Sequence, residues 1–458
     1  MGLGQGRRTL AGWGLVAALV GGGAAGAVAP LGQPQEQATG VARQAQRQKE
    51  QARIRPAAFD LARFPLTEAH ETHWRRLLWA VTVLNPPDAY IPPALEQILA
   101  QAGRPQPTAV ETRVITQTLQ LVHQWLSRNP QGYPELVAGL RGIVATSPHP
   151  RWVALASLTL VRSGQAAPRQ LQATIQQRFP TPTGLLEVTL REVLAPAANA
   201  PVTPPPLADL LRWSVAPGEP HLYVFCRPDR WVLCQAILKD RQGQFVTTAG
   251  RLWSVPLLTQ SIYGLDWAFT YGQTPQGLYR LEGLTPPREA ALFRAYGQFP
   301  MVKLFLPFEA GVQAFLPGRP GPLTGSLADY EVLVPPTWRG YRPLHQSYWA
   351  GRLGRGLLRI HGMGDDPSFF SRPAEAATQA WNPALGCLTA LEAYDAQGNL
   401  QDAHMPILLD ALRQVGGDTG YVWVVEVPPA PGEAGRPVSL ETLAAAVGQA
   451  QLAQTPGR

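Results

Sequence analysis

Two stretches, IHGMGDD at residues 360–366 and NPALGCLTALE at residues 382–392, place a histidine and a cysteine beside short apolar runs typical of β-strands. A free cysteine is only a few per cent thiolate at neutral pH, so a nucleophilic Cys387 needs a base such as His361 to take its proton. Gly386, which has no Cβ, leaves room for a carbonyl group close to the backbone. The same residues also fit a buried cysteine and a histidine at the end of a strand.

A third stretch, TYGQTPQGLYRLEG at residues 270–283, precedes these two. In this order the three stretches resemble the catalytic domain of L,D-transpeptidases of the YkuD type, over about residues 218–428. That family has a T-P-x-G-x-aromatic segment, then I-H-G, then S-x-G-C followed by an apolar residue and an arginine. The matching residues here are Thr274, Pro275, Gly277, Tyr279, Ile360, His361, Gly362, Gly386, Cys387 and Leu388.

The chain departs from the family pattern on both sides of the cysteine. Ala384 stands where the family has Ser or Thr, and Thr389 stands where it has the arginine. Either Arg359 or Arg372 could replace that arginine. The segment between the histidine and the cysteine is also longer than in the family, which indicates a divergent member.

The resemblance implies acyl transfer on the stem peptides of peptidoglycan. Cys387 would attack the carbonyl of the third stem residue and form a thioester, while His361 serves as general base and then as general acid. A backbone carbonyl near Gly362 would orient the imidazole, and backbone amides near Gly386 would face the oxyanion. The acceptor would be an amine of a second stem, water or a protein, and the reaction needs no cofactor and no metal.

Several further residues are candidates for substrate binding or support. Thr389 and Arg359 are candidate substrate contacts, and Tyr348, Trp349 and Trp381 could line a groove or fill the core. The Thr274–Pro275–Gly277 segment is expected to be a supporting turn. The remaining candidates, each with a structural alternative, are Asp365, Asp366, His345 and His404.

Composition limits the class of protein. The 458 residues include 44 Gly and 46 Pro and carry a formal net charge of +7. This composition favours a loop-rich, β-containing protein with a diffusely basic surface. Basic residues are not interleaved with aromatic residues in runs, so we expect no nucleic-acid partner.

The amino terminus predicts export. Residues 1–30 combine Arg7–Arg8 with a small, uncharged run that ends in Ala27–Val28–Ala29, so they are expected to be a signal peptide or a membrane anchor. The protein would then act in the periplasm or on the outer face of the cytoplasmic membrane. Cys226 and Cys234 flank an expected hairpin turn and would be either a disulfide or two buried thiols, with Cys387 left free.

The rest of the chain divides by pattern into five segments, so the predicted fold class is multidomain α + β. A Gln- and Arg-rich tether is expected at 31–56, because it has few apolar residues to bury. Apolar residues at three- and four-residue steps predict a helical domain at 57–194, either HEAT-like helical hairpins that begin near residues 66, 108 and 149 and could bind a protein partner, or a compact bundle. A Pro-rich linker at 195–217 leads to the β-rich mixed-sheet domain at 218–428, whose expected strands include YEVLVP at residues 330–335. A low-complexity tail at 429–458 follows, in which Ser439 with Glu441 could start a short helix.

The main alternatives to the L,D-transpeptidase are a catalytically silent protein that binds wall polymer or scaffolds partners, and a related amidase or carboxypeptidase.

Overall fold

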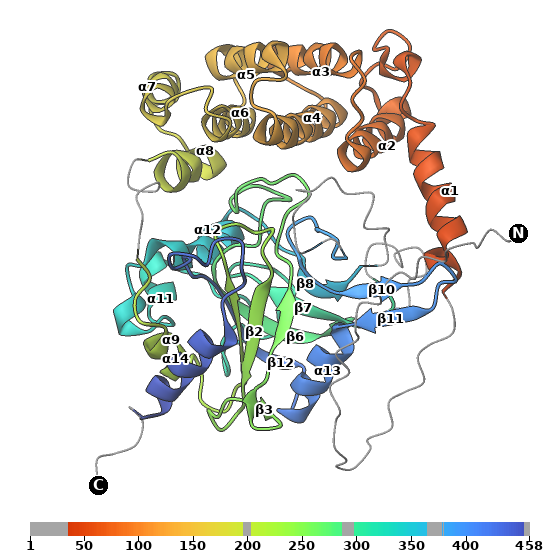
Figure 1. Cartoon of the computed structure of the whole chain (residues 1–458). Helices are drawn as coiled ribbons and strands as arrows, with labels where there is room; N and C mark the ends of the chain where they lie inside the picture. The colour runs from red at the N-terminus through yellow and green to blue at the C-terminus, as the bar shows by residue number, and fades with distance from the viewer. Residues whose placement is uncertain (1–34, 196–202, 286–296, 364–377, 379, 453–458) are drawn as a thin grey trace, which may run out of the picture.

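A computed structural model describes residues 35–195, 203–285, 297–363, 378 and 380–452. The fold is mixed α + β, with helices in the first part of the described chain and a large mixed sheet in the second (Figure 1). Residues 1–30, where we expect the signal peptide or anchor, lie outside the described residues. Within the described residues, no helix combines the length and the apolar character needed to cross a membrane.

The helical region is built in two layers above the sheet region (Figure 1). Helices α2, α4 and α6 pack in succession, and α3 and α5 lie over them. Their ends follow the sequence: Thr108 and Glu111 form a reciprocal capping box at the start of α4, and prolines begin α5, α6 and α7. The helices are α2 (Glu68–Leu84), α3 (Ile91–Leu99), α4 (Ala109–Arg128), α5 (Pro134–Thr146), α6 (Pro150–Arg162), α7 (Pro168–Arg178) and α8 (Gly184–Val188).

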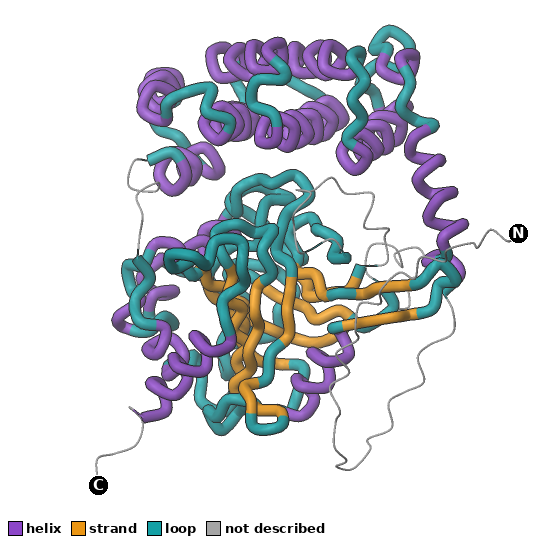
Figure 2. Tube along the Cα trace, viewed as in Figure 1, coloured by secondary structure: helices purple, strands orange, loops and turns teal. Residues whose placement is uncertain are grey.

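An eight-stranded mixed sheet forms the centre of the second region, in the order β5-β2-β1-β12-β6-β7-β8-β9. Figure 2 shows the strands, in orange, gathered below the helical region. Two pairs, β1 with β12 and β8 with β9, are parallel. The strands of this sheet are β1 (His221–Cys226), β2 (Cys234–Lys239), β5 (Val255–Leu257), β6 (Gly277–Thr285), β7 (Met301–Phe305), β8 (Leu358–Gly362), β9 (Leu388–Ala390) and β12 (Thr419–Glu426). Two short hairpins stand beside it: β3 (Thr247–Thr248) with β4 (Arg251–Leu252), and β10 (Glu392–Tyr394) with β11 (Leu400–Ala403).

The sheet curls until its two edges almost meet. Leu258, directly after edge strand β5, exchanges two 2.8 Å backbone hydrogen bonds with Thr389 in edge strand β9. The unpaired backbone groups of both edges are therefore partly satisfied by each other. The cysteine motif lies at this seam.

Helices cover both faces of the sheet, because each strand alternates its side chains between two apolar layers. Leu222 and Val224 pack on one face with α13 (Met405–Gln414). Tyr223 and Phe225 pack on the other face, in one core with side chains of four helices. These are α9 (Leu207–Arg212), α11 (Leu327–Glu331), α12 (Gln346–Arg352) and α14 (Leu440–Leu452).

Three segments differ from the sequence predictions. Residues 40–51 of the expected tether form α1 (Gly40–Gln51), and Gly40 N donates to Ala396 O at the β10–β11 turn, so backbone contacts replace the missing apolar face. The tail contains the short helix expected at Ser439 and Glu441 as α14, but it is not a low-complexity surface segment, because its Leu443 and Val447 are buried in the core. The stretch YEVLVP, expected as a strand, begins inside α11, where a Ser326–Asp329 capping box starts a helix.

Cys226 and Cys234 form a disulfide that joins the end of β1 to the start of β2, and Cys387 is the free cysteine. The bond clamps the loop of residues 227–233. Two buried arginines hold the same loop: Arg227 donates to the carbonyls of Val427, Pro428 and Arg436, and Arg230 pairs with Glu426.

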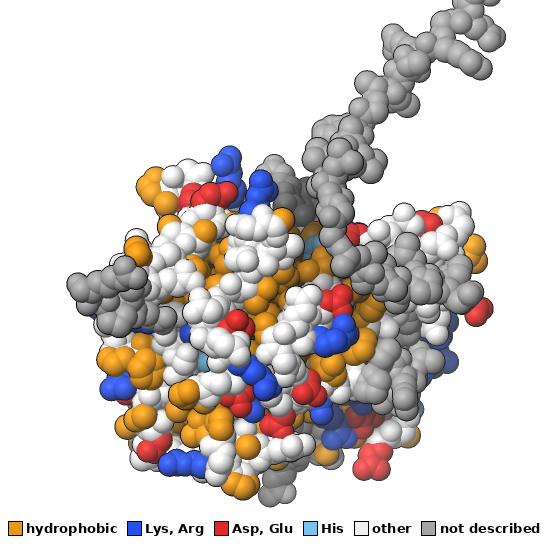
Figure 3. Space-filling view, turned by 90° about the horizontal axis from the view of Figure 1, so that it is seen from below, with side chains coloured by type: hydrophobic (Ala, Val, Ile, Leu, Met, Phe, Trp, Pro, Cys, Tyr) orange, Lys and Arg blue, Asp and Glu red, His pale blue; other side chains and the backbone are white. Residues whose placement is uncertain are grey.

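The lower face of the molecule carries basic and acidic side chains interspersed with apolar ones (Figure 3). This mixture agrees with a diffuse distribution of the net charge of +7.

Candidate active site at the sheet seam

The cysteine and the histidine lie on neighbouring parallel strands. Strand β9 pairs with β8 so that Leu388 faces Ile360 and Thr389 faces His361. Continuing this register by one residue places Cys387 beside Arg359, and alternation places Cys387 and His361 on the same face of the sheet. One diagonal step of this kind separates the Cα atoms by about 8 Å, from the spacing between strands and the rise per residue.

The thiol of Cys387 is partly exposed, and its sulfur lies 3.9 Å from the carbonyl oxygen of Leu357. Leu357 is 75% exposed and has a φ of +61°, which is rare for a bulky residue. Burial raises the pKa of the thiol above its ordinary value, while the Arg359 backbone and guanidinium and the Arg355 guanidinium act to lower it. The resting group is therefore a thiol that needs a base before it can attack.

The imidazole of His361 is set as a proton acceptor. Its Nδ1 lies 2.7 Å from the carbonyl oxygen of Gly362, which can only accept a hydrogen bond, so Nδ1 carries the proton. Burial lowers the pKa of His361 to about 4, so the ring is neutral at neutral pH and its Nε2 holds a lone pair. The side chain is 2% exposed, which keeps this orientation fixed.

Gly386 is required by its conformation and by its neighbours. Its φ is +107°, and a Cβ there would lie 2.7 Å from both Arg355 Nη2 and Gly272 O. Its carbonyl oxygen accepts a 2.9 Å hydrogen bond from the Thr274 hydroxyl. The residue before the cysteine is therefore held by the TPQG segment on one side and by an arginine on the other.

Arg355 is the residue of this site that the sequence did not reveal. It is 8% exposed, and its guanidinium donates to the carbonyl oxygens of Trp267, Gly272 and Gln273. Burial lowers its pKa to about 10, and the negative form of Cys387 acts to raise it. The positive charge close to the thiol therefore comes from Arg355 together with Arg359. Position 389, where the family has an arginine, does not supply it.

The loop that holds Arg355 is itself anchored in the helical region. Tyr263, Leu265 and Phe269 are buried in the apolar core of the helices. Arg162 of α6 donates two hydrogen bonds to Asp266, at 3.0 and 2.8 Å. Consequently, the helical region braces residues 259–274, and this loop braces the turn that carries Cys387.

The other predicted residues lie in different surroundings. Tyr348 is 1% exposed and donates to Gly325 O, so it is a core residue and lines no groove. Thr389 is fully buried and donates to Asn382 O, so its side chain is not exposed for contact with a substrate. Trp349 packs between the two regions with Arg191 over its ring at 4.1 Å, away from the seam.

The remaining polar candidates do not gather at the thiol. His345 pairs with Glu331 at 3.0 Å, and the His404 ring packs against that of Trp381. Asp365, Asp366 and Arg372 lie outside the described residues. Among the described residues, no three His, Cys, Asp or Glu side chains come together as a metal site.

A buried acid, also missed by the sequence, lies against the histidine motif. Glu392 is 5% exposed, and its Oε1 accepts from Gln298 N at 2.8 Å. A Cβ on Gly362 would come within 1.9 Å of Glu392 Oε2, so any other residue there would force the buried carboxyl group to move. Burial raises the pKa of Glu392 to about 7. Its place in an unremarkable ALEAY sequence gave no signal of this role.

Comparison with known protein families, with curated proteins and with solved structures found no match for this chain.

Proposed function

We propose that this protein is an exported cysteine acyltransferase of the L,D-transpeptidase type that acts on peptidoglycan stem peptides. The observation that carries the proposal is the placement of His361, with Nδ1 bonded to the Gly362 carbonyl, on the strand next to Cys387 and on the same face. The order of the TPQG, IHG and GCL motifs supports the family, and the Cys226–Cys234 disulfide supports an oxidising compartment.

The reaction proceeds through a thioester. The Cys387 sulfur attacks the carbonyl carbon of the third stem residue, while His361 Nε2 takes the thiol proton. The carbon–nitrogen bond to the terminal residue then breaks, and the imidazolium gives its proton to the departing amine. An amine of a second stem attacks the thioester, its proton passes to His361, and the thiol is regenerated.

Substrate binding has a defined task in this scheme. In the resting structure the sulfur faces Leu357 O, and both thiol and imidazole are neutral. The thiol must give up its contact with Leu357 O before its proton can move to His361. A peptide lying along Leu357 would displace the sulfur from that carbonyl and so favour the transfer.

Arg355 acts as a positioning residue. Its hydrogen bonds to three carbonyls of the 267–273 segment hold that loop against Gly386. Its positive charge favours the thiolate form of Cys387. In this proposal it takes the place of the family arginine that is absent at Thr389. The stacked helix pairs, which resemble HEAT-like hairpins, position the site through the same loop.

A second candidate is a catalytically silent protein that binds wall polymer. Two observations favour it: the thiol pKa is raised, and position 389 is a buried threonine bonded to Asn382. Under this alternative the seam is a binding surface and Cys387 stays unmodified.

Covalent labelling with a carbapenem, read by intact mass, separates the two. We expect one adduct on the wild-type chain, none on Cys387→Ala, and labelling slowed about 100-fold or more in His361→Gln, since a general base contributes about 10²–10⁴. The absence of an adduct on the wild type, or an adduct that persists in Cys387→Ala, would refute the proposal.

Incubation with purified sacculi identifies the reaction. New cross-links between third residues are expected for the wild type and not for Cys387→Ala. Release of peptides without new cross-links would assign the protein to the amidase or carboxypeptidase alternative.

A further inference from the structure

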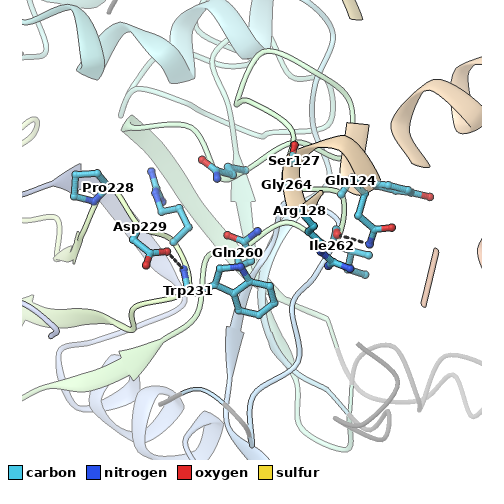
Figure 4. A pocket seen from close by; sticks show the side chains of 12 residues that line it. Gln124, Ser127, Arg128, Pro228, Asp229, Trp231, Gln260, Ile262 and Gly264 are labelled. Carbon is cyan, nitrogen blue, oxygen red and sulfur yellow. Dashed lines mark hydrogen bonds between the residues drawn. The ribbon is translucent and has the colours of Figure 1, made fainter. Parts of the chain in front are cut away.

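A polar cavity of about 570 Å³ lies where the helical region meets the sheet region (Figure 4). This volume falls within the range of about 300–1,000 Å³ that is common for small-ligand sites. The cavity is bounded by the end of α4, the disulfide-clamped 227–233 loop and the loop after β5. Its lining residues are Gln124, Ser127, Arg128, Pro228, Asp229, Arg230, Trp231, Gln260, Ile262, Tyr263, Gly264 and Gln273.

One wall is held by a buried carboxamide that joins the helices to the loop after β5. Gln124 is 3% exposed, and its Nε2 donates to Thr82 O and Ile262 O at 3.2 and 3.0 Å. Its Oε1 is buried beneath the cavity surface. Gln124 therefore fixes the position of this wall, and the other polar lining residues are the ones that a ligand would contact.

The opposite wall is rigid before any ligand arrives. The Cys226–Cys234 bond closes the loop, and Arg230, 2% exposed, is bonded to Glu426, Thr259 and the Thr274 carbonyl. Trp231 N donates to Asp229 Oδ1 at 3.0 Å. A wall held in this way loses little conformational freedom on binding.

The chemistry of the lining selects against simple ions. Arg230 is already neutralised by Glu426, and the lining carries one further charge of each sign, on Asp229 and Arg128. The carboxamides of Gln260 and Gln273 offer both donors and acceptors, whereas both Nε2 protons of Gln124 are already donated. Figure 4 shows the Trp231 ring beside Gln260, between Asp229 on one side and Gln124 and Arg128 on the other, so a flat apolar surface lies among polar groups.

We propose that this cavity binds a carbohydrate, and specifically an N-acetylated amino sugar unit. The hydroxyl and acetamido groups match the carboxamides of Gln260 and Gln273, and the apolar face of a sugar ring matches the Trp231 indole. The inference goes beyond the proposed acyl transfer and does not require Cys387 to react.

The cavity and the thiol share one loop, which gives binding there a physical connection to the seam. The backbone carbonyl of Gln260 accepts from Ala384 N, three residues before Cys387. The carbonyl of Gln273 accepts from Arg355 at 3.0 Å. A sugar in the cavity would contact both residues that support the cysteine turn.

The test is calorimetric titration of the full chain with N,N′,N″-triacetylchitotriose as the probe. The wild type and Cys387→Ala are expected to bind with the same affinity, so loss of the thiol chemistry leaves the result unaffected. Trp231→Ala is expected to weaken binding at least tenfold, and Trp231→Phe, which keeps an aromatic face, by no more than about threefold.

Gln273→Ala gives a second, milder variant, because no hydrogen bond of its side chain supports the fold among the described contacts. It is expected to weaken binding at least fivefold, while its matched control Gln97→Ala, exposed on α3, leaves the affinity unchanged. The proposal is overturned if the wild type does not bind the probe at millimolar concentration. It is also overturned if Trp231→Ala and Gln273→Ala both bind the probe as tightly as the wild type does. Binding of inorganic phosphate that is lost in Arg128→Gln also overturns it.

Discussion

The thiol of Cys387 lies between opposing charges, and Arg359 has the larger favourable effect on its ionisation. The backbone and guanidinium of Arg359 lower the pKa of the thiol, while burial and Glu309 raise it. We expect Arg359→Gln to raise the thiol pKa further and to slow iodoacetamide alkylation at pH 8 about threefold, because only the thiolate reacts. Mass spectrometry of timed samples measures the rate. Arg76→Gln, exposed on α2, is the control, and a faster reaction in Arg359→Gln would contradict the assignment.

The buried carboxyl group of Glu392 makes the stability of the fold depend on pH, because its folded pKa of about 7 lies above the ordinary value of 4.5. The folded protein therefore binds a proton more tightly than the unfolded chain, and stability is lost as the pH rises from about 4.5 through 7. Glu392→Gln should raise the free energy of unfolding at pH 8 by about 1–3 kcal/mol and change it little at pH 5. Urea unfolding at the two pH values tests this, and equal effects at both would refute it.

The sequence singled out Cys387 and His361 but not the residues that support them. Both lie in recognisable local motifs, so they could be chosen as candidates from their neighbours in the chain. Arg355 and Glu392 have no such motif, because their partners are backbone groups of loops about 80–95 residues away in the chain. Burial of Tyr348 and Thr389 likewise depends on tertiary packing that no local pattern encodes.

The turn before the cysteine is expected to tolerate no side chain beyond glycine. In Gly386→Ala the added Cβ would combine a φ of +107° with contacts of 2.7 Å to Arg355 Nη2 and Gly272 O. Gly318→Ala shares the positive φ but has open space around it, so it isolates the conformational cost. We expect Gly386→Ala to lose about 2 kcal/mol more stability than Gly318→Ala, since overpacking costs about 1–3 kcal/mol.

The same pair of variants reports on the thiol. Carbapenem labelling of Cys387 should be slower in Gly386→Ala and unchanged in Gly318→Ala. Equal unfolding free energies in the two variants would show that Arg355 and Gly272 do not confine the turn.

At the level of elements, long periodic helices were predicted well and short or polar ones were not. The expected hairpin starts near residues 66, 108 and 149 correspond to α2, α4 and α6. Helix α1 was not predicted because the sequence was searched for an apolar face, which this helix lacks. Backbone hydrogen bonding to the β10–β11 turn holds its start instead. The YEVLVP stretch was misassigned as a strand. Its buried residues Tyr330 and Val334 are four positions apart, which is the spacing of a helical turn and not the alternation of a strand.

The whole molecule should lose stability in mild acid. Burial lowers the pKa of His123 and His361 to about 4 and that of His221 to about 3, so these rings stay neutral when folded. The unfolded chain protonates them below their ordinary pKa of 6.5, so the free energy of unfolding falls as the pH drops from 6.5 toward 4. The slope is at most about 1.4 kcal/mol per pH unit for each histidine, and Glu392 offsets part of it.

Urea unfolding at pH 7.0, 5.5 and 4.5 measures this slope. His123→Gln should make the slope of stability against pH shallower, because it removes one histidine that is neutral in the folded protein and protonated in the unfolded chain. In the folded protein this neutral ring bonds Thr159 in the helices and Gly264 in the loop. Equal stability at all three pH values would contradict the burial of neutral histidines.

Two features of the whole fold lay beyond sequence reasoning. The near-closure of the sheet depends on Leu258 meeting Thr389, two residues 131 positions apart. The docking of residues 259–274 into the helices depends on shape and on the pairing of Arg162 with Asp266. Composition and periodicity gave the mixed α + β class, but such contacts arise only when the two regions meet.

The spacing of the three cysteines matters when the disulfide forms. A newly made chain carries three thiols, and an oxidant could join them in three ways, two of which would consume Cys387. Cys226 and Cys234 are eight residues apart, so their short loop makes them meet far more often than either meets Cys387. The correct bond therefore forms first, and the remaining sulfur is left unblocked for the mature protein.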